Sequence, residues 1–168
     1  RLVLNLKQTL NRSWLYEYTM KEDESYSEEE GFKGFNEIIG PATVSKTSFT
    51  IIGNDKTVNG GGYSGIVMEP YKFDTEWKLN TQTLNVTSVT WTNFNSANGG
   101  VIYNDSGTVN LTAVTFKSNT ATDKGGAIAN YNGGTINMND GVVFAQNTAT
   151  YGHTLSLDRK SGSAGMPR

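Results

Sequence analysis

Apolar and polar residues alternate along short stretches of the chain, and the phase of the alternation reverses inside each stretch. In LNVTSVTW (84–91), Leu84 and Val86 share one parity, whereas Val89 and Trp91 share the other. Side chains alternate between the two faces of a strand, so a straight strand would turn half of these residues to solvent. A bend at the reversal lets all four point inward. We therefore predict two short strands that meet at a corner.

The same pattern recurs further along the chain. VNLTAVTF (109–116) aligns with 84–91 at an offset of 25 residues and reverses its phase across Thr112 and Ala113. INMNDGVVF (136–144) is a third copy with three extra residues. A repeat of this length is too short for a pair of helices and suits one turn of a solenoid.

A glycine pair introduces a further short strand in two of the copies. The pairs at 99–100 and 125–126 lie 26 residues apart, and each leads into a strand that ends in Asn. Glycine adopts positive φ and allows close approach of backbones, so the pairs predict sharp corners stacked about 4.8 Å apart. We expect Asn119 and Asn147 to stack at the preceding corner, with each amide bonded to the backbone of the next coil.

Three strands per turn, with a loop before the third, predict an all-β parallel β-helix of roughly five coils and about 25 Å in length. Abundant Gly, Asn and Thr fit this class, because they disfavour helices. The predicted interior consists of Leu84, Val86, Val89, Trp91, Ile102, Val109, Leu111, Val114, Phe116, Ile128, Ile136, Met138, Val143 and Phe144.

The pattern divides the chain into three regions. Residues 1–47 are expected to hold an N-terminal strand, an aromatic cap and an acidic loop, and residues 48–156 the β-helix. Residues 69–83 break the pattern and predict a lateral loop or an irregular coil. Residues 157–168 are expected to be a flexible tail. The chain starts at Arg1 without a signal-like stretch, which indicates a processed protein or part of a longer one.

The segment FKSNTATDKGGAIAN (116–130) resembles the F-x-x-N and G-G-A-I signatures of polymorphic outer membrane protein repeats, which also occur in adhesin-like surface proteins. SFTIIGNDKTVNGGGYSGI (48–66) is similar to a segment that often precedes them. The resemblance covers about residues 48–154 and implies a right-handed parallel β-helix displayed outside the cell. In the third copy, YGHT replaces G-G-A-I, so the β-helix is expected to end or change near residue 150. The motif positions are Trp91, Gly99, Gly100, Phe116, Asn119, Gly125, Gly126, Phe144 and Asn147.

Composition and charge narrow the function. A net charge of −2 without a basic patch gives no electrostatic reason to bind nucleic acid. The absence of cysteine excludes disulfides and thiolate metal sites, and no apolar run is long enough to cross a bilayer. The aspartates are scattered in turn contexts, and His153, the single histidine, has no partners for zinc and is expected to replace a glycine in the last corner. We therefore predict no catalytic site, no metal and no cofactor.

Four N-x-S/T sequons are candidate sites of N-glycosylation. Asn85 and Asn110 lie between inward positions and are expected to face solvent. The four asparagines are Asn11, Asn85, Asn104 and Asn110.

These observations predict a non-catalytic, adhesin-like or structural module that is extracellular or at the cell surface. Its expected partner is a glycan or protein on a host or neighbouring cell. Three alternatives stay open. The chain could stack end to end through its solenoid edges as a homo-oligomer or filament subunit, because unpaired strand edges pair with other chains. It could be part of a polysaccharide lyase or hydrolase, or its outward threonines could bind ice.

Overall fold

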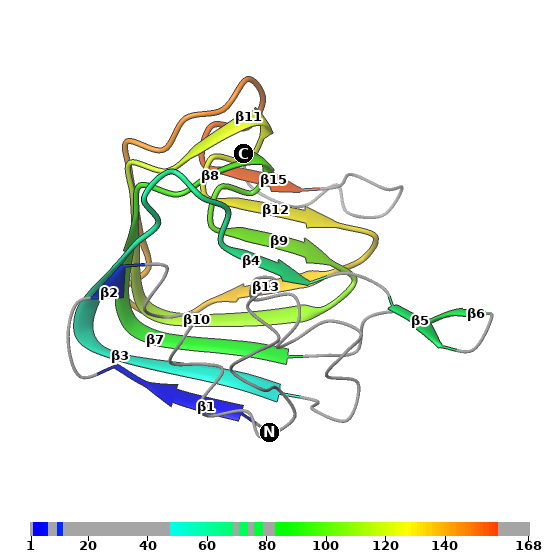
Figure 1. Ribbon diagram of the computed structural model, residues 1–168, viewed down its shortest axis with the longest axis horizontal. Helices are drawn as coiled ribbons and strands as arrows, with labels where there is room; N and C mark the ends of the chain where they lie inside the picture. Colours follow the sequence, from blue (N-terminus) through cyan, green and yellow to red (C-terminus); the bar gives the residue numbers. More distant parts are fainter. Residues whose placement is uncertain are drawn as a thin grey trace, which may run out of the picture.

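The structure is a computed structural model that describes residues 2–6, 10–11, 48–68, 71–73, 76–78 and 83–157, and all regular elements in these ranges are β-strands. The strands stack into a column in which successive coils lie side by side (Figure 1). The strands are β1 (Leu2–Asn5), β2 (Leu10–Asn11), β3 (Ser48–Asn59), β4 (Ile66–Met68), β5 (Tyr71–Phe73), β6 (Glu76–Lys78), β7 (Thr83–Thr92), β8 (Asn95–Asn98), β9 (Ile102–Asp105), β10 (Thr108–Lys117), β11 (Thr120–Lys124), β12 (Ile128–Tyr131), β13 (Thr135–Met138), β14 (Val143–Ala145) and β15 (Leu155–Leu157).

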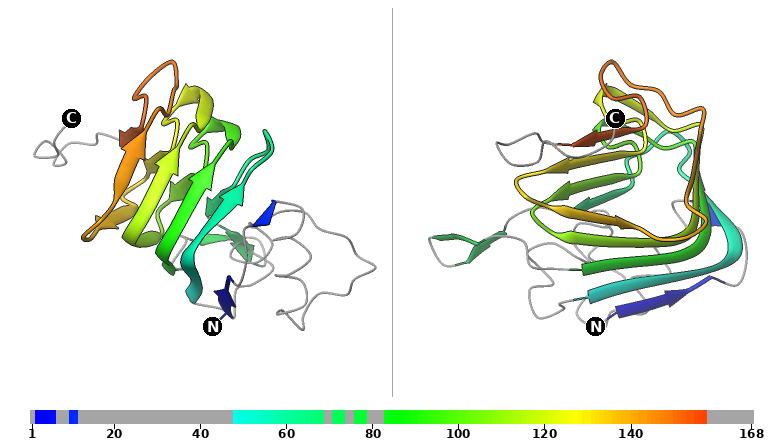
Figure 2. Two further views of the ribbon diagram at one scale, coloured as in Figure 1. Left: turned by 90° about the vertical axis from the view of Figure 1, so that its left-hand side faces the viewer. Right: turned by 180° about the vertical axis from the view of Figure 1, so that it is seen from behind.

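The largest sheet has seven strands in the order β1-β3-β7-β10-β13, with β2 beside β3 and β14 beside β10. All of its strand pairs are parallel, and the strands of successive coils lie side by side (Figure 2). Leu84 pairs with Val109, which pairs in turn with Ile136. The predicted stacking of the three copies in register is therefore confirmed.

Two further parallel sheets complete the column. One has four strands in the order β15-β12-β9-β4, and the other is the pair β11-β8. We expected a loop where β8 and β11 lie, and this expectation was wrong. These segments are polar and lack an apolar period of two, but they pair with each other because equivalent residues of successive coils lie in register.

Each long strand bends where the phase of its alternation reverses. In β7 and β10 the buried positions switch parity across residues 87–88 and 112–113. Ser88 and Ala113 adopt φ values of 54° and 53°, in the left-handed region. The predicted corner is thus confirmed, although it lies within one continuous strand. In β3 the bend contains extra residues, and Asn54 and Asp55 take the positive φ values.

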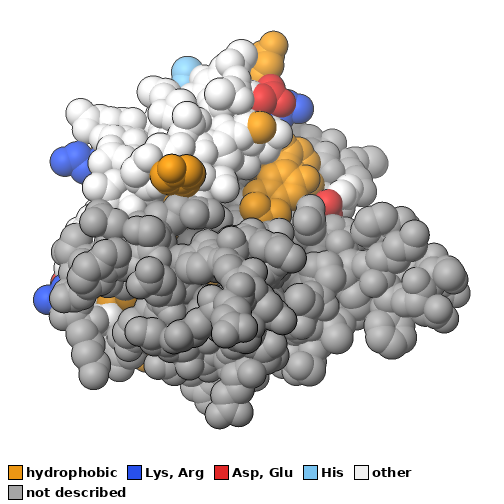
Figure 3. All heavy atoms as spheres, viewed as in Figure 1, with side chains coloured by type: hydrophobic (Ala, Val, Ile, Leu, Met, Phe, Trp, Pro, Cys, Tyr) orange, Lys and Arg blue, Asp and Glu red, His pale blue; other side chains and the backbone are white. Residues whose placement is uncertain are grey.

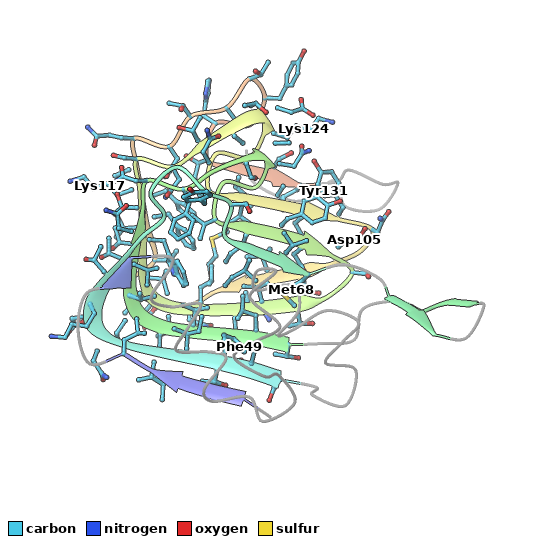
Figure 4. The ribbon with its side chains drawn as sticks, in the orientation of Figure 1. Phe49, Met68, Asp105, Lys117, Lys124 and Tyr131 are labelled. Carbon is cyan, nitrogen blue, oxygen red and sulfur yellow. The ribbon has the colours of Figure 1, made fainter. Side chains whose placement is uncertain are left out.

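A single cluster of apolar side chains fills the column. Phe49 and Met68, on opposite walls, both belong to this cluster (Figure 4). The predicted interior is confirmed for the first two copies, but Met138 and Val143 are 41% and 49% exposed. Val143 pairs with the outward-facing Thr115, so the prediction that it faces inward was wrong. Met138 has the inward parity, but its strand β13 has a described partner, β10, on one side alone.

Parts of the predicted regional division lie outside the described residues, namely the aromatic cap, the acidic loop and residues 158–168. β1 pairs in parallel with β3, and Leu6 belongs to the buried cluster, so the first residues join the same column. Within residues 69–83, β5 and β6 form an antiparallel pair that projects from the side of the column (Figure 1).

Candidate functional site

The aromatic residues of the repeat motif lie in register inside the column. Trp91 pairs in register with Phe116, which pairs with Phe144. The ring centroids of Phe116 and Phe144 lie 5.1 Å apart at an interplanar angle of 10°. Trp91 and Phe116 are fully buried, whereas Phe144 is half-buried at the end of the column. Nε1 of Trp91 is buried and has no hydrogen-bond partner among the described residues.

The asparagines of the motif form a buried ladder between coils. Oδ1 of Asn147 accepts hydrogen bonds from the backbone N–H of Asn119, at 3.1 Å, and from its Nδ2, at 3.0 Å. Nδ2 of Asn147 donates to the carbonyl of Phe116 at 2.9 Å, and Nδ2 of Asn119 donates to the carbonyl of Trp91 at 3.0 Å. The predicted Asn stack is confirmed, but each side chain binds the backbone of the preceding coil. Both side-chain amides are hydrogen-bonded, and these bonds offset the free-energy cost of burying them.

The ladder ends at Phe94, which occupies the Asn position of the first copy. Its backbone N–H donates to Oδ1 of Asn119 at 3.0 Å, and its ring lies 5.7 Å from that of Trp91. The segment WTNF is therefore the equivalent of F-x-x-N with an aromatic residue in the last place. The spacing from Trp91 could have identified Phe94 as a core residue, but the search for Asn at this place missed it.

The glycine pairs form the corner that precedes β9 and β12. Gly99 and Gly125 both have φ of 65°. A Cβ atom on Gly100 would lie 2.1 Å from the carbonyl oxygen of Gly126, and one on Gly126 would lie 2.3 Å from that of His153. Each second glycine is required because the backbone of the following coil passes directly over it.

His153 occupies the equivalent place in the last described coil. Lys124 bridges to Tyr151, and Ile128 pairs with Leu155, so His153 lies opposite Gly126. Its side chain is exposed. The prediction that it replaces a corner glycine is confirmed.

A second Asn ladder lies at the end of the third strand. Nδ2 of Asn104 donates to Oδ1 of Asn130 at 2.7 Å and to the carbonyl of Gly107 at 2.8 Å. Asn104 is fully buried, and its Oδ1 has no partner among the described residues, because its register neighbour in the preceding coil is Met68. A glycan on Asn104 is incompatible with this burial, so the geometry does not support its sequon as a site.

Two other sequons, at Asn85 and Asn110, lie on the outer face of the long sheet. Asn85 and Asn110 are half-buried and hydrogen-bonded in an outer ladder, in which Asn137 donates to Asn110 at 2.7 Å and Asn110 donates to Asn85 at 2.9 Å. Asn11 lies in β2 opposite Asn59. Thr90 and Thr115 pair in register on this outer face, and Val143 occupies the equivalent position in the next coil.

The described residues hold no group of three or more His, Cys, Asp or Glu side chains that could bind a metal ion. Asp74 and Asp158 lie outside these residues, as does the acidic loop. The motif residues that the structure describes are all used in packing and in bonds between coils, so the repeat builds a scaffold. In the described part of the chain, no helix is long and apolar enough to cross a membrane.

The fold and the motif together define a parallel β-solenoid whose coils are joined by aromatic and Asn ladders and by glycine corners. Residues 113–131 match the Chlamydia polymorphic membrane protein repeat, so the chain carries a repeat of this family. The matched segment contains the bend of β10, the F-x-x-N corner and the G-G-A-I strand, which confirms the resemblance seen in the sequence. Comparisons with curated proteins and with solved structures find no match.

Proposed function

We propose that this chain is a non-catalytic, adhesin-like module displayed at the cell surface, built as a right-handed β-helix with coils of about 25 residues. The match to a repeat of polymorphic membrane proteins carries this proposal, because that family is associated with the outer membrane and the cell surface. The spacing of 25 residues in the ladder between Asn110 and Asn85 supports the coil length.

The hydrogen bonds between coils support the role of a rigid scaffold. The buried side chains of Asn119 and Asn147 are bonded to the neighbouring coils, and the outer asparagines are bonded to each other. A rigid column of this kind presents its outer faces and loops as a fixed surface to a partner.

Bead adhesion tests the surface role. Latex beads coated with the purified chain are added to epithelial cell monolayers, with albumin-coated beads and beads coated with heat-unfolded chain as controls. The proposal expects adhesion of the folded chain well above both controls. Adhesion no greater than that of albumin would contradict it, as would release of unsaturated sugars from pectin or alginate by the chain.

End-to-end assembly is a second candidate function, and the last described coil supports it. Among the described residues, β13 and β14 have a partner on the β10 side alone, and β15 on the β12 side alone. Met138 has the inward parity and is 41% exposed, so apolar surface and unpaired strand edges occur together at this end. Such an edge is a template for another strand.

A pair of lysine substitutions tests this assembly. Met138→Lys places a charge on the open end of the column and is expected to abolish concentration-dependent growth in light scattering and fibres in electron microscopy. Val143→Lys is the matched control, because its side chain faces outward, and it is expected to leave assembly intact. Particles that stay monomeric in the unmodified chain at all concentrations would contradict the second candidate.

A further inference from the structure

Two tyrosine side chains meet on the outer face of the four-stranded sheet. The ring centroids of Tyr103 in β9 and Tyr131 in β12 lie 5.4 Å apart at an interplanar angle of 38°. Both residues are half-buried, so part of each faces solvent. Figure 3 shows a hydrophobic patch over this part of the molecule, and in Figure 4 Tyr131 lies on the outer side of the column.

The register of the two strands explains why the rings meet. Side chains alternate along a strand, so Ala129 and Tyr131 share the outer face of β12, opposite Tyr103 and Asp105 on β9. Ala129 is fully buried although it faces outward. A small residue at this place leaves room for the ring of Tyr103 to reach the ring of Tyr131.

Polar side chains border the aromatic pair. Oη of Tyr131 donates to Oδ1 of Asn98 at 3.2 Å, which fixes the orientation of one ring. Nδ2 of Asn132 donates to Oδ1 of Asp105 at 2.9 Å, which fixes the carboxylate beside the same ring. A carboxylate has about four lone-pair sites, so Asp105 keeps capacity to accept further hydrogen bonds.

We propose that Tyr103, Tyr131 and Asp105 form a binding platform for a neutral pyranose glycan, a proposal that rests on the surface role above. One face of a pyranose ring presents C–H groups, which pack on the negative face of an aromatic ring. Its hydroxyl groups donate to carboxylate and amide oxygens at the edge. Tyrosine offers a large contact area at a low cost in conformational entropy. The carboxylate disfavours sialylated or sulfated glycans by charge repulsion.

The sheet topology disfavours one kind of peptide ligand at this place, a peptide that pairs as a strand. Such a peptide binds to a sheet by adding a strand to a free edge. β9 and β12 both have strand partners on their two sides, in the order β15-β12-β9-β4. The backbone of the platform is therefore already paired, and recognition is left to the side chains.

Direct binding of defined sugars tests the platform. Chitotetraose and cellotetraose are the neutral probes, and a heparin tetrasaccharide is the anionic one, each titrated into the full chain by calorimetry and by saturation-transfer NMR. At least one neutral probe is expected to bind and the heparin fragment to bind more weakly. Tyr103→Ala and Tyr131→Ala are each expected to weaken binding about tenfold, the loss that accompanies about 1.4 kcal/mol.

Two variants serve as controls, and circular dichroism verifies that each one folds. Tyr131→Phe keeps the ring and loses the hydrogen bond to Asn98, so a loss below about threefold is expected, since a neutral hydrogen bond contributes little net free energy. Tyr151→Ala removes a tyrosine that is 62% exposed and is expected to leave binding unchanged.

Several outcomes would overturn the platform: no binding of either neutral probe, preference for the heparin fragment or for a proline-rich peptide titrated in the same way, or binding that survives both alanine variants. The bead experiment separates this proposal from the surface role. Adhesion by the chain without tyrosine-dependent sugar binding overturns the platform and leaves the surface role standing. Tyrosine-dependent sugar binding without bead adhesion supports the platform and contradicts the surface role.

Discussion

The coil that contains β10 and the coil that contains β13 and β14 place equivalent residues side by side, yet their surroundings differ. Leu111 is fully buried between coils, whereas its register partner Met138 is 41% exposed. Gly126 lies beneath the backbone of the following coil, whereas the equivalent His153 has an exposed side chain. The comparison shows that coils on both sides, rather than the position within one coil, determine which residues a place in the repeat tolerates.

Truncation of the paired core residues tests this difference most strongly. Leu111→Ala leaves a cavity between two coils and is expected to lower the free energy of unfolding by about 3 kcal/mol or more. Met138→Ala is expected to cost about 1 kcal/mol, because the side chain is already partly in water. Urea unfolding followed by circular dichroism measures both. Equal losses would show that the last coil is covered in solution.

The corner glycine tests the same comparison through steric overlap. Gly126→Ala brings a Cβ atom within 2.3–2.7 Å of backbone atoms of His153 and Thr148, none of which can move as a side chain would. We expect a loss of about 3 kcal/mol, in the upper part of the range for overpacking. His153→Ala changes an exposed side chain and is expected to shift the free energy of unfolding by less than about 0.5 kcal/mol. A tolerated Gly126→Ala would contradict the close approach of the coils.

The two kinds of Asn ladder provide a third contrast, between the inside and the outside of the column. Asn119→Ala removes the acceptor for Phe94 N–H and the donor to the carbonyl of Trp91, both buried. A loss of about 2 kcal/mol is expected, because buried backbone groups are left unpaired. Asn137→Ala removes an exposed side chain of the outer ladder, and the loss in free energy of unfolding should stay below about 0.5 kcal/mol. Thermal or urea unfolding of both variants measures the two losses. A larger loss from the outer substitution would contradict the greater stabilisation assigned to the buried ladder.

The smallest effect is expected where the first copy departs from the motif. Nε1 of Trp91 is buried without a partner among the described residues, and Phe occupies the equivalent place at 116 and 144. Trp91→Phe removes the unpaired donor, which offsets the lost volume, so the change should stay within about 1 kcal/mol. Trp91→Ala serves as the comparison and is expected to cost about 3–5 kcal/mol. A loss of that size in Trp91→Phe as well would show that the indole makes a contact the fold requires.

The sequence predicted the column well because its signals are local and repeated. The reversal of parity between Val86 and Val89 indicated the bend, and the copy at 109–116 showed that the bends stack in register. The glycine pairs and the asparagines at 119 and 147 indicated the corners, because each residue type has one physical reason to occur there.

The parts that the sequence did not predict depend on neighbouring coils. Asn104 has the form of a surface sequon, and its burial follows from its bond to Asn130, 26 residues away. The exposure of Met138 follows from the lack of a described strand beyond β13. The contact between Tyr103 and Tyr131 is diagonal, with the small Ala129 opposite Tyr103, which no pattern within one strand indicates.

Cysteine cross-linking tests the register of the column most directly, because the chain contains no cysteine of its own. Thr90 and Thr115 are register partners on the outer face, so a Thr90→Cys/Thr115→Cys variant is expected to form an intramolecular disulfide under mild oxidation. A Thr90→Cys/Asn110→Cys variant is the control, since Asn110 pairs with Asn85 and lies five residues back along β10, beyond its bend, so this variant should stay reduced. Cross-linking of the first variant alone is the predicted result. Equal cross-linking of both variants, or of the control alone, would contradict the stacking of the coils in register.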